Sequence, residues 1–183
     1  MDFRVSREAF LRVLTHVSSI VDSRSTIPIL SNIYLKCENN QIEIRSTDMD
    51  ISIREFVSCD STKNGEATVN SRILTDIIRK TKKNSIVKCK LEGNRLIINS
   101  DNSVFELNAL SAEEFPKFVT LDPTNSFDLT IPQMKRLFNK TKFAISAEET
   151  RYYLNGIYFH TISNNSKTAL RCVATDGHRL AKT

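Results

Sequence analysis

Residues 171–183 read RCVATDGHRLAKT, which sets an acid, Asp176, two residues before a titratable base, His178. A second such pair, Asp48 and Asp50, lies in the stretch STDMD. Side chains two residues apart on a strand point to the same side, so either pair could bind a metal ion or relay a proton. The same residues could equally form a hairpin turn. The elements that position them decide between these two roles.

Periodicity predicts those elements. Apolar residues recur at helical spacing from Ser6 to Val21 and again from Ser71 to about Lys82. Alternating apolar and polar residues predict strands, whereas the stretch DSTKNGE (60–66) reads as a polar loop. The predicted strands are 29–37, 41–46, 49–58, 67–70, 85–91, 94–100 and 103–110. This order of helices and strands is typical of the α+β class.

Residues 127–146 repeat the layout of residues 3–22 at an offset of 124, and the same offset aligns YLNGIYF with ILSNIYL. Chance rarely keeps one register through a helix and a strand, so we infer one domain that has been duplicated. A linker near residues 116–126 would separate a first domain, 1–120, from a second, 126–183. The second copy would hold only the first half of the repeated unit, as expected for part of a longer protein.

The repeat also bears on the candidate chemistry. With a hairpin four residues longer in the second copy, Thr175–Asp176 falls under Thr47–Asp48. A Thr–Asp step hydrogen-bonds its own backbone and shapes a turn, so we favour a structural role for both acids over catalysis. His178 and Arg179 have no counterparts in the first copy, so the shared turn does not explain their presence.

The composition argues against several functional classes. Four glycines are too few for a Gly-rich phosphate loop, and neither G-x-S-x-G nor H-E-x-x-H occurs. The cysteines, Cys37, Cys59, Cys89 and Cys172, lack a C-x-x-C pair, which favours buried free thiols over metal or disulfide chemistry. We expect no cofactor and no bound metal. No apolar run reaches the ~18 residues that span a bilayer and no signal peptide is evident, so we expect a cytoplasmic protein without a membrane partner.

The formal net charge is +5, and the basic residues concentrate on the predicted helices. The second helix and its end carry Arg72, Arg79, Lys80, Lys82 and Lys83 against one acid, Asp76, and the third carries Lys135, Arg136, Lys140 and Lys142 against none. Such basic residues usually form a solvent-exposed helix face. An excess of positive charge on the helices of both copies also fits contact with nucleic-acid phosphates. Base stacking is not indicated. The adjacent Tyr152 and Tyr153, at the start of a strand, are the exception, and burial of one with exposure of the other is the simpler interpretation.

Several stretches together carry a resemblance. TIPILSNIYL, FP after the first domain, RYYLNGIYF and VATDGHRLA closely resemble the bacterial sliding clamp family, the β subunit of DNA polymerase III. The resemblance implies repeated α+β domains, each with two helices packed on antiparallel sheets, and a homodimer ring around duplex DNA. It implies a processivity factor that is no enzyme and slides without sequence preference. The implied protein partners are the polymerase III catalytic subunit, the clamp loader and repair polymerases, which bind through short linear motifs.

The same resemblance assigns roles to individual residues. The wall of a peptide-binding pocket would comprise Leu154, Thr175, Gly177, His178, Arg179 and Leu180. DNA contacts would comprise Arg24, Tyr152 and Tyr153, together with the helix cations Arg72, Arg79, Lys80, Lys135, Arg136 and Lys140. Glu148 departs from a position where the family can have a neutral polar residue, and it would repel phosphate. The ring interface would comprise Ile73, Ile77, Phe105 and Leu107, although periodicity alone would put them in the core.

Two alternatives stay open from the residues alone. One is a metal-dependent nuclease or hydrolase fragment that uses Asp176 and His178, which would lose activity in the variant His178→Ala. The other is a DNA-binding module without sequence preference that forms no ring and needs no partner domain.

Overall fold

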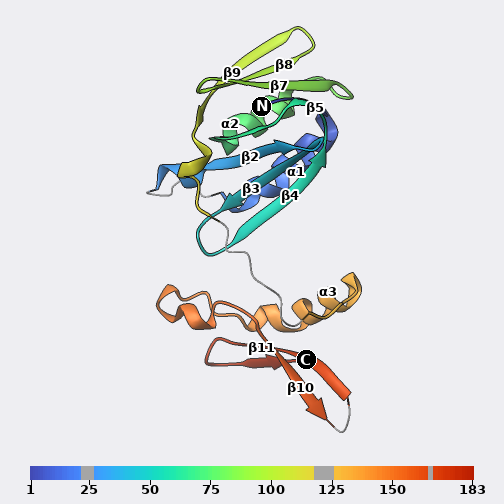
Figure 1. Cartoon of the computed structure of the whole chain (residues 1–183). Helices are drawn as coiled ribbons and strands as arrows, with labels where there is room; N and C mark the ends of the chain where they lie inside the picture. The colour runs from blue at the N-terminus through green and yellow to red at the C-terminus, as the bar shows by residue number, and fades with distance from the viewer. Residues whose placement is uncertain (22–26, 118–125, 165–166) are drawn as a thin grey trace. The chain divides into compact units, whose positions relative to one another are not determined.

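The structure, a computed structural model, describes residues 1–21, 27–117, 126–164 and 167–183 (Figure 1). It separates into two compact units, Met1–Thr120 (unit 1) and Leu121–Thr183 (unit 2), and each is described by itself. Within the described ranges, no helix is both long enough and apolar enough to cross a membrane.

The described residues of unit 1 form two helices and a nine-stranded antiparallel sheet of order β4-β3-β2-β6-β9-β8-β7-β1-β5. The bounds are β1 (Asp2–Ser6), α1 (Arg7–Val17), η1 (Ser18–Ile20), η2 (Pro28–Ser31), β2 (Asn32–Glu38), β3 (Gln41–Thr47), β4 (Ser52–Ser58), β5 (Asp60–Lys63), β6 (Gly65–Asn70), α2 (Ser71–Lys80), β7 (Ile86–Glu92), β8 (Arg95–Ser100), β9 (Ser103–Leu110) and η3 (Ala112–Glu114). The helices α1 and α2 lie side by side on these strands (Figure 1).

Polar side chains fasten the two helices to each other. Arg7, which begins α1, donates from Nε and Nη2 to the carbonyl oxygens of Ile78 and Arg79 at the end of α2, at 3.2 and 2.7 Å. Carbonyls in the last turn of a helix lack helical partners, so the guanidinium satisfies them. Near the other end of the pair, Ser18 Oγ lies 3.0 Å from Thr75 Oγ1. These contacts determine which face of α2 stays exposed.

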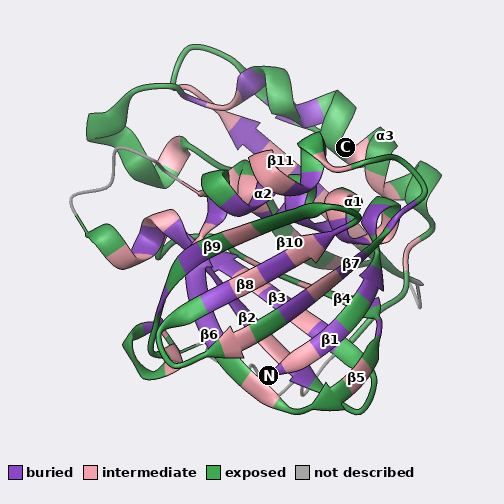
Figure 2. Ribbon diagram, turned by 90° about the horizontal axis from the view of Figure 1, so that it is seen from above, coloured by how far each residue is buried: buried purple, intermediate pink, exposed green. Residues whose placement is uncertain are grey.

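Among the described residues of unit 1, a large hydrophobic core lies between the helices and the strands (buried residues are purple in Figure 2). Helical spacing buries Phe10 and Leu14 of α1 completely, and strand alternation does the same for Ile42 and Ile44 of β3. Phe10 meets Phe3 of β1 edge to face, with ring centroids 6.2 Å apart. Burial of each such side chain stabilises the unit by about 1.5–3 kcal/mol.

Unit 2 consists of one helix, short 3-10 segments and an antiparallel sheet of order β10-β11-β12 among its described residues. The bounds are α3 (Ile131–Thr141), η4 (Lys142–Ala144), η5 (Glu149–Leu154), β10 (Tyr158–Asn164), β11 (Lys167–Thr175) and β12 (Leu180–Lys182). A capping box begins α3: Thr130 Oγ1 accepts the Gln133 N–H, and Gln133 Oε1 accepts the Thr130 N–H. The buried apolar cluster comprises only alanines, Ala144, Ala174 and Ala181, among the residues described.

The α+β prediction is confirmed, and α3 begins and ends 124 residues after α1, which is the offset of the repeat. Some boundaries differ from the sequence prediction. The expected polar loop contains β5, which pairs with the unpredicted N-terminal strand β1. Two expected strands begin later, at Asn32 and Ser52. Pro28 starts a 3-10 turn before the first, and the Asp48 side chain organises a tight turn before the second.

Candidate functional site

The acid–base pair at Asp176 lies in a turn that the pair itself builds. Asp176 Oδ1 accepts the backbone N–H groups of His178 and Arg179, each at 3.0 Å. Its Oδ2 accepts Arg179 Nε at 2.9 Å. Thr175 Oγ1 accepts the Gly177 N–H at 3.1 Å and donates to the Arg179 carbonyl at 2.7 Å. Every hydrogen bond at this step therefore serves the local backbone or the neighbouring arginine.

The turn at Asp48 repeats the four bonds of this pattern that involve the backbone, but not the side-chain bond from Arg179, because Ile51 stands in its place. Asp48 Oδ1 accepts the N–H groups of Asp50 and Ile51 at 3.0 and 2.7 Å. Thr47 Oγ1 accepts the Met49 N–H at 3.0 Å and donates to the Ile51 carbonyl at 2.9 Å. The predicted structural role of both Thr–Asp steps is confirmed. Contrary to expectation, His178 and Arg179 do have positional counterparts, because the turn bonds place them level with Asp50 and Ile51, which are residues of different type.

Electrostatics argue against proton transfer at this turn. The two backbone N–H groups, with a further contribution from the Arg179 side chain, lower the pKa of Asp176 to about 2. A general base works best when its pKa lies near the operating pH, so this carboxylate is poorly suited to the task. The described residues contain no group of three or more potential metal ligands. The nuclease or hydrolase alternative therefore has no support.

The predicted peptide-pocket residues surround this turn. Leu180, which opens β12, has 62% of its surface exposed, and Leu154 is half-buried at the end of η5. Gly177 has φ +89°, and a Cβ placed on it would lie 3.1 Å from Nη1 of Arg151 in η5. The 3-10 segment and the turn thus lie side by side.

Two residues that sequence reasoning missed also belong to this surface. The guanidinium of Arg179 lies over the ring of Phe143, 5.8 Å from its centroid. Arg151 contacts the turn through the approach to Gly177 and pairs with Glu148, Nε to Oε2, at 3.1 Å. The Arg179–Phe143 and Arg151–Gly177 contacts do not follow from sequence spacing, because each joins segments that are distant in sequence. The exposed aromatic at Phe143, directly after a basic helix, was the available signal.

The predicted interface residues divide between surface and core. Ile73 of α2 is 52% exposed, whereas Leu107 of β9 is buried, yet both line one cavity of about 440 Å³. Ile77 and Phe105 are partly buried and pack against the core of unit 1. The structure therefore brings Ile73 and Leu107 together at one cavity, whereas Ile77 and Phe105 do not line that cavity.

The strand that carries Leu107 has an open edge beside this cavity. β9 pairs with β8 along residues 103–108, but with β6 only at Ala109 and Leu110 among the described residues. Backbone groups on that side of residues 103–107 are therefore available to a further strand, as at any exposed sheet edge.

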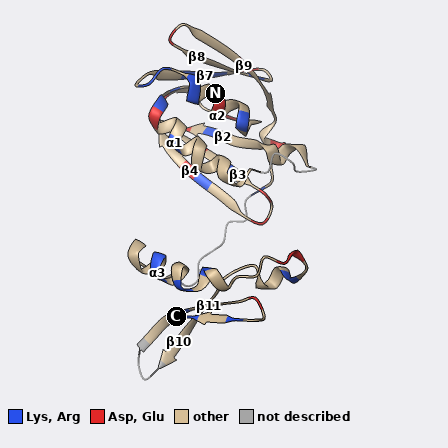
Figure 3. Ribbon diagram, turned by 180° about the vertical axis from the view of Figure 1, so that it is seen from behind, with Lys and Arg blue, Asp and Glu red and all other residues tan. Residues whose placement is uncertain are grey.

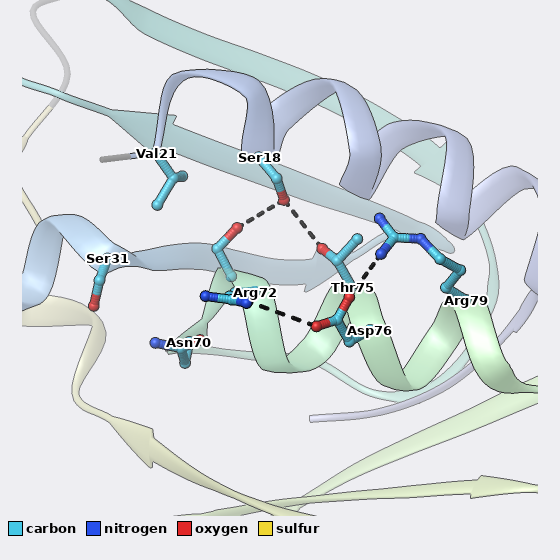
Figure 4. Close-up of a pocket in the computed structure, with 9 residues that line it drawn as sticks. Ser18, Val21, Ser31, Asn70, Arg72, Thr75, Asp76 and Arg79 are labelled. Carbon is cyan, nitrogen blue, oxygen red and sulfur yellow. Dashed lines mark hydrogen bonds and ion pairs between the residues drawn. The ribbon is translucent and has the colours of Figure 1, made fainter. Parts of the chain in front are cut away.

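The cations of α2 are partly compensated by their one acid (Figure 4). Asp76 pairs with Arg79, Nη1 to Oδ1 at 2.7 Å, and more loosely with Arg72, Nε to Oδ2 at 4.0 Å. The three side chains line a cavity of about 580 Å³ beside Ser18 and Thr75. Both arginine side chains stay largely exposed, at 83% and 57%. Asp76 thus reduces the combined charge of Arg72 and Arg79 on this face of α2 from +2 to +1.

The cations of α3 have no such compensation (Figure 3). Lys135, Arg136 and Lys140 are exposed, and no ion pair joins them, or Lys80 of α2, to an acid within the described residues. α3 is therefore the more strongly basic of the two helices. Arg24, also predicted to contact DNA, lies outside the described residues.

The tyrosine pair differs from its prediction. Tyr152 and Tyr153 lie in the 3-10 segment η5, not at the start of a strand, and both are exposed, at 79% and 72%. Their rings meet edge to face at 5.8 Å. The interpretation that one is core was wrong, because residues 149–154 form a 3-10 segment without a buried residue before β10 begins. Glu148 does not stand as an isolated charge, since Arg151 neutralises it.

The fold and these surfaces define a protein of the DNA clamp class, and comparison with known proteins gives the family. Residues 1–121 match the model of the DNA polymerase III beta subunit, N-terminal domain, and residues 128–183 match that of its central domain. The chain therefore belongs to the DNA polymerase III beta subunit family, which confirms the resemblance.

Individual relatives agree. The chain is 40% identical to the beta sliding clamp of Caulobacter vibrioides over 99% of its own length, and 35% identical to that of Pseudomonas aeruginosa, also over 99%. A solved Caulobacter crescentus pol III beta structure superposes with a TM-score of 0.93 at 41% identity. A sliding clamp from Bartonella birtlesii bound to griselimycin gives 0.94 at 38%. Both structural comparisons cover 100% of this chain but 49% of the relative, and the chain spans about half the length of the curated relatives it matches.

Proposed function

We propose that the chain serves as a processivity factor for a replicative DNA polymerase, as part of a sliding clamp that encircles duplex DNA and tethers the polymerase. The observation that carries the proposal is the uncompensated basic face of α3 within a chain of this family. Phosphate contacts position a protein on DNA without reading sequence, so such a face attracts a duplex and still lets it slide.

Within this proposal, residues 1–120 are the first clamp domain and residues 126–183 the first half of the second. The protein acts in the bacterial cytoplasm, carries no catalytic site of its own, and meets its polymerase, clamp loader and repair partners through their short linear motifs. The homodimer ring would be closed at the surface of Ile73, Ile77, Phe105 and Leu107. The open edge of β9 supports that role, because a strand from a neighbouring chain could extend the sheet there.

Fluorescence anisotropy with a labelled duplex tests the DNA part of the proposal. Binding should be weak, equal for two unrelated sequences, and steeply salt-dependent, with a slope of about −0.9 per phosphate contacted. The double variant Lys135→Ala/Arg136→Ala should bind more weakly with a shallower slope. Lys90→Ala is the matched control, because Lys90 is an exposed cation on the sheet that pairs with Glu92 at 2.5 Å. Salt-independent or sequence-selective binding would refute the proposal.

Asp76 offers a sharper test of the α2 face. The variant Asp76→Asn removes the carboxylate charge that holds Arg79 and Arg72 while keeping the shape of the side chain. Both arginines then become free for phosphate, so affinity for DNA should rise several-fold and the salt slope should steepen by about one contact. Unchanged binding would mean that DNA does not reach α2.

The peptide-binding part of the proposal rests on the turn at 175–180. The Bartonella and one Pseudomonas aeruginosa clamp structure contain griselimycin, which makes it a suitable probe. Titration of griselimycin into isotope-labelled protein should shift the backbone amides of Gly177, His178 and Arg179. The variant Leu180→Asp should abolish these shifts, because it puts a charge where an apolar anchor would bind. Shifts confined to other segments would contradict the assignment.

A further inference from the structure

A pair of cysteines in unit 1 forms a sulfur–sulfur contact that the proposed function does not use. Cys37 on β2 and Cys59 between β4 and β5 are both free thiols, as predicted, and their Sγ atoms lie 3.9 Å apart. Both are buried, at 0% and 8% exposed. Cys89 and Cys172 are also buried and free. The two cysteines lie 22 positions apart in sequence, which explains why spacing did not reveal the pair.

The two thiols differ in access. Cys59 lines a cavity of about 310 Å³ together with its neighbours Ser58 and Asp60, residues of β1 and Ile86 of β7. Cys37 lies behind it on the inner side of β2, where strand pairing with Ile42 and Gly65 holds the backbone. A small solute that enters the cavity reaches Cys59 first, and Cys37 is then the neighbouring sulfur.

The local backbone can close the remaining gap. A disulfide needs a separation of about 2.05 Å between its sulfurs, so the pair must approach by roughly 2 Å. Cys59 is the single residue between β4 and β5, and β5 is an outer strand that pairs only with β1 in the described sheet. The Cys59 N–H donates to the Asn40 carbonyl at 2.9 Å, and Asn40 Oδ1 accepts the Ser61 N–H at 3.1 Å. Rotation of the two side chains and a small shift of this junction would bring the sulfurs together.

We propose that Cys37 and Cys59 form a peroxide-sensitive dithiol in which Cys59 is oxidised first and Cys37 resolves it to an intrachain disulfide. The Cys59 thiolate attacks one oxygen of hydrogen peroxide, so that an S–O bond forms, the O–O bond breaks and hydroxide leaves. Cys37 sulfur then attacks the sulfenic sulfur of Cys59, the S–O bond breaks, and water leaves with the Cys37 proton. Two thiols and one peroxide give one disulfide and two waters.

The surroundings make this oxidation slow at neutral pH and faster in alkali. Burial, and then the neighbouring Cys37, raise the pKa of Cys59 to about 12, with Asp60 adding to the effect. The Met1 amino group lies near Cys37, and Arg4 lines the cavity. Because the thiolate is the nucleophile, the rate should rise about tenfold for each pH unit below that pKa. The dithiol would thus respond to sustained peroxide and not to traces.

Mass spectrometry on the intact chain tests the proposal without relying on the proposed function. The protein is treated with graded hydrogen peroxide, alkylated after denaturation, and digested with trypsin, which places Cys37 in peptide 37–45 and Cys59 in peptide 55–63. The expected product is these two peptides cross-linked, separated again by dithiothreitol. The cross-link should also raise the midpoint of thermal unfolding by about 10 °C, because it closes a loop of some twenty residues.

Variants separate the two roles. In Cys37→Ala, Cys59 should stop at the sulfenic acid, which dimedone traps; in Cys59→Ala, Cys37 should stay reduced. Cys89→Ala, a buried thiol of β7, is the matched control and should leave the cross-link intact. The proposal is overturned if, in alkaline buffer, the wild-type chain gives no cross-link at a peroxide dose that converts Met49, 62% exposed, to its sulfoxide. Equal oxidation of Cys89 would also overturn it, because that would indicate unfolding.

Discussion

Leu14 and Phe138 occupy the same position in the repeat, yet Leu14 is fully buried and Phe138 is 40% exposed. The two helices that carry them have the same length and the same register. In unit 1, α2 and the strands β6 to β9 complete the core around α1. The described part of unit 2 has no counterpart of these elements. The sequence pattern of a helix therefore specifies which of its faces is apolar, but burial of that face depends on the other elements of the domain.

The largest expected difference is in resistance to protease. Unit 1 buries a continuous core, whereas the buried cluster described in unit 2 is made of alanines. Local opening should therefore be rare in unit 1 and frequent in unit 2. Limited trypsin digestion should leave a core of about residues 1–120 while cleaving at the exposed Lys135, Arg136 and Lys140. Mass measurement of the fragments gives the answer, and equal resistance of residues 126–183 in a monomer would remove the distinction between the units.

A matched pair of core substitutions should give the next largest effect. Leu14→Ala leaves a cavity in a closed core and should cost about 2–5 kcal/mol of unfolding free energy. Phe138→Ala removes a ring that stays partly exposed and meets Phe159 edge to face at 5.9 Å. It should cost no more than about 1 kcal/mol. Urea unfolding monitored by circular dichroism compares them. A cost at Phe138 similar to that at Leu14 would show that α3 is buried in solution.

These contrasts also show what the sequence could and could not predict. Helices and most strands followed from periodicity, and the two Thr–Asp turns followed from the repeat, because each depends on neighbouring residues. β5 was missed because an outer strand such as Asp60–Lys63 needs no apolar face, and its polar residues imitate a loop. The exposure of both Tyr152 and Tyr153 was missed because a 3-10 segment, stabilised by local bonds, replaced the expected start of a strand.

The candidate site was predictable in part for the same reason. Positions such as Gly177 and Leu180 came from a motif that stays together in sequence. The pairing of Asp76 with two arginines of α2 was within reach of helical spacing, since Arg72 and Arg79 lie four and three residues away. The placement of Phe143 under Arg179 and of Cys59 beside Cys37 depends on chain segments meeting in space, which no local pattern encodes.

Acid should affect the turn of unit 2 only at low pH. The pKa of Asp176 is lowered in the folded chain to about 2 by the N–H groups of Arg179 and His178. A lowered folded-state pKa means that the stabilisation is present above the unfolded value near 3.9 and is lost as pH falls through about 2. The amide shifts of His178 and Arg179 should follow a titration with that midpoint. A midpoint near 4 would mean that the turn bonds do not form in solution.

The smallest effect should come from the two residues at the same turn position, Met49 with φ +84° and Gly177 with φ +89°. A side chain is strained in this region and glycine is not, so Met49→Gly should stabilise unit 1 by about 0.5–1 kcal/mol. Gly177→Ala should destabilise its turn by a similar amount. The added Cβ would meet only the flexible end of Arg151, at 3.1 Å, so the cost should come from the backbone and persist in the double variant Gly177→Ala/Arg151→Ala. Thermal unfolding measures the first variant, and hydrogen exchange at the His178 and Arg179 amides measures the others. If removing Arg151 cancelled the cost of Gly177→Ala, glycine would be required at position 177 for close packing against η5. The two turns would then share their backbone hydrogen bonds, but the positive φ would have a different cause in each.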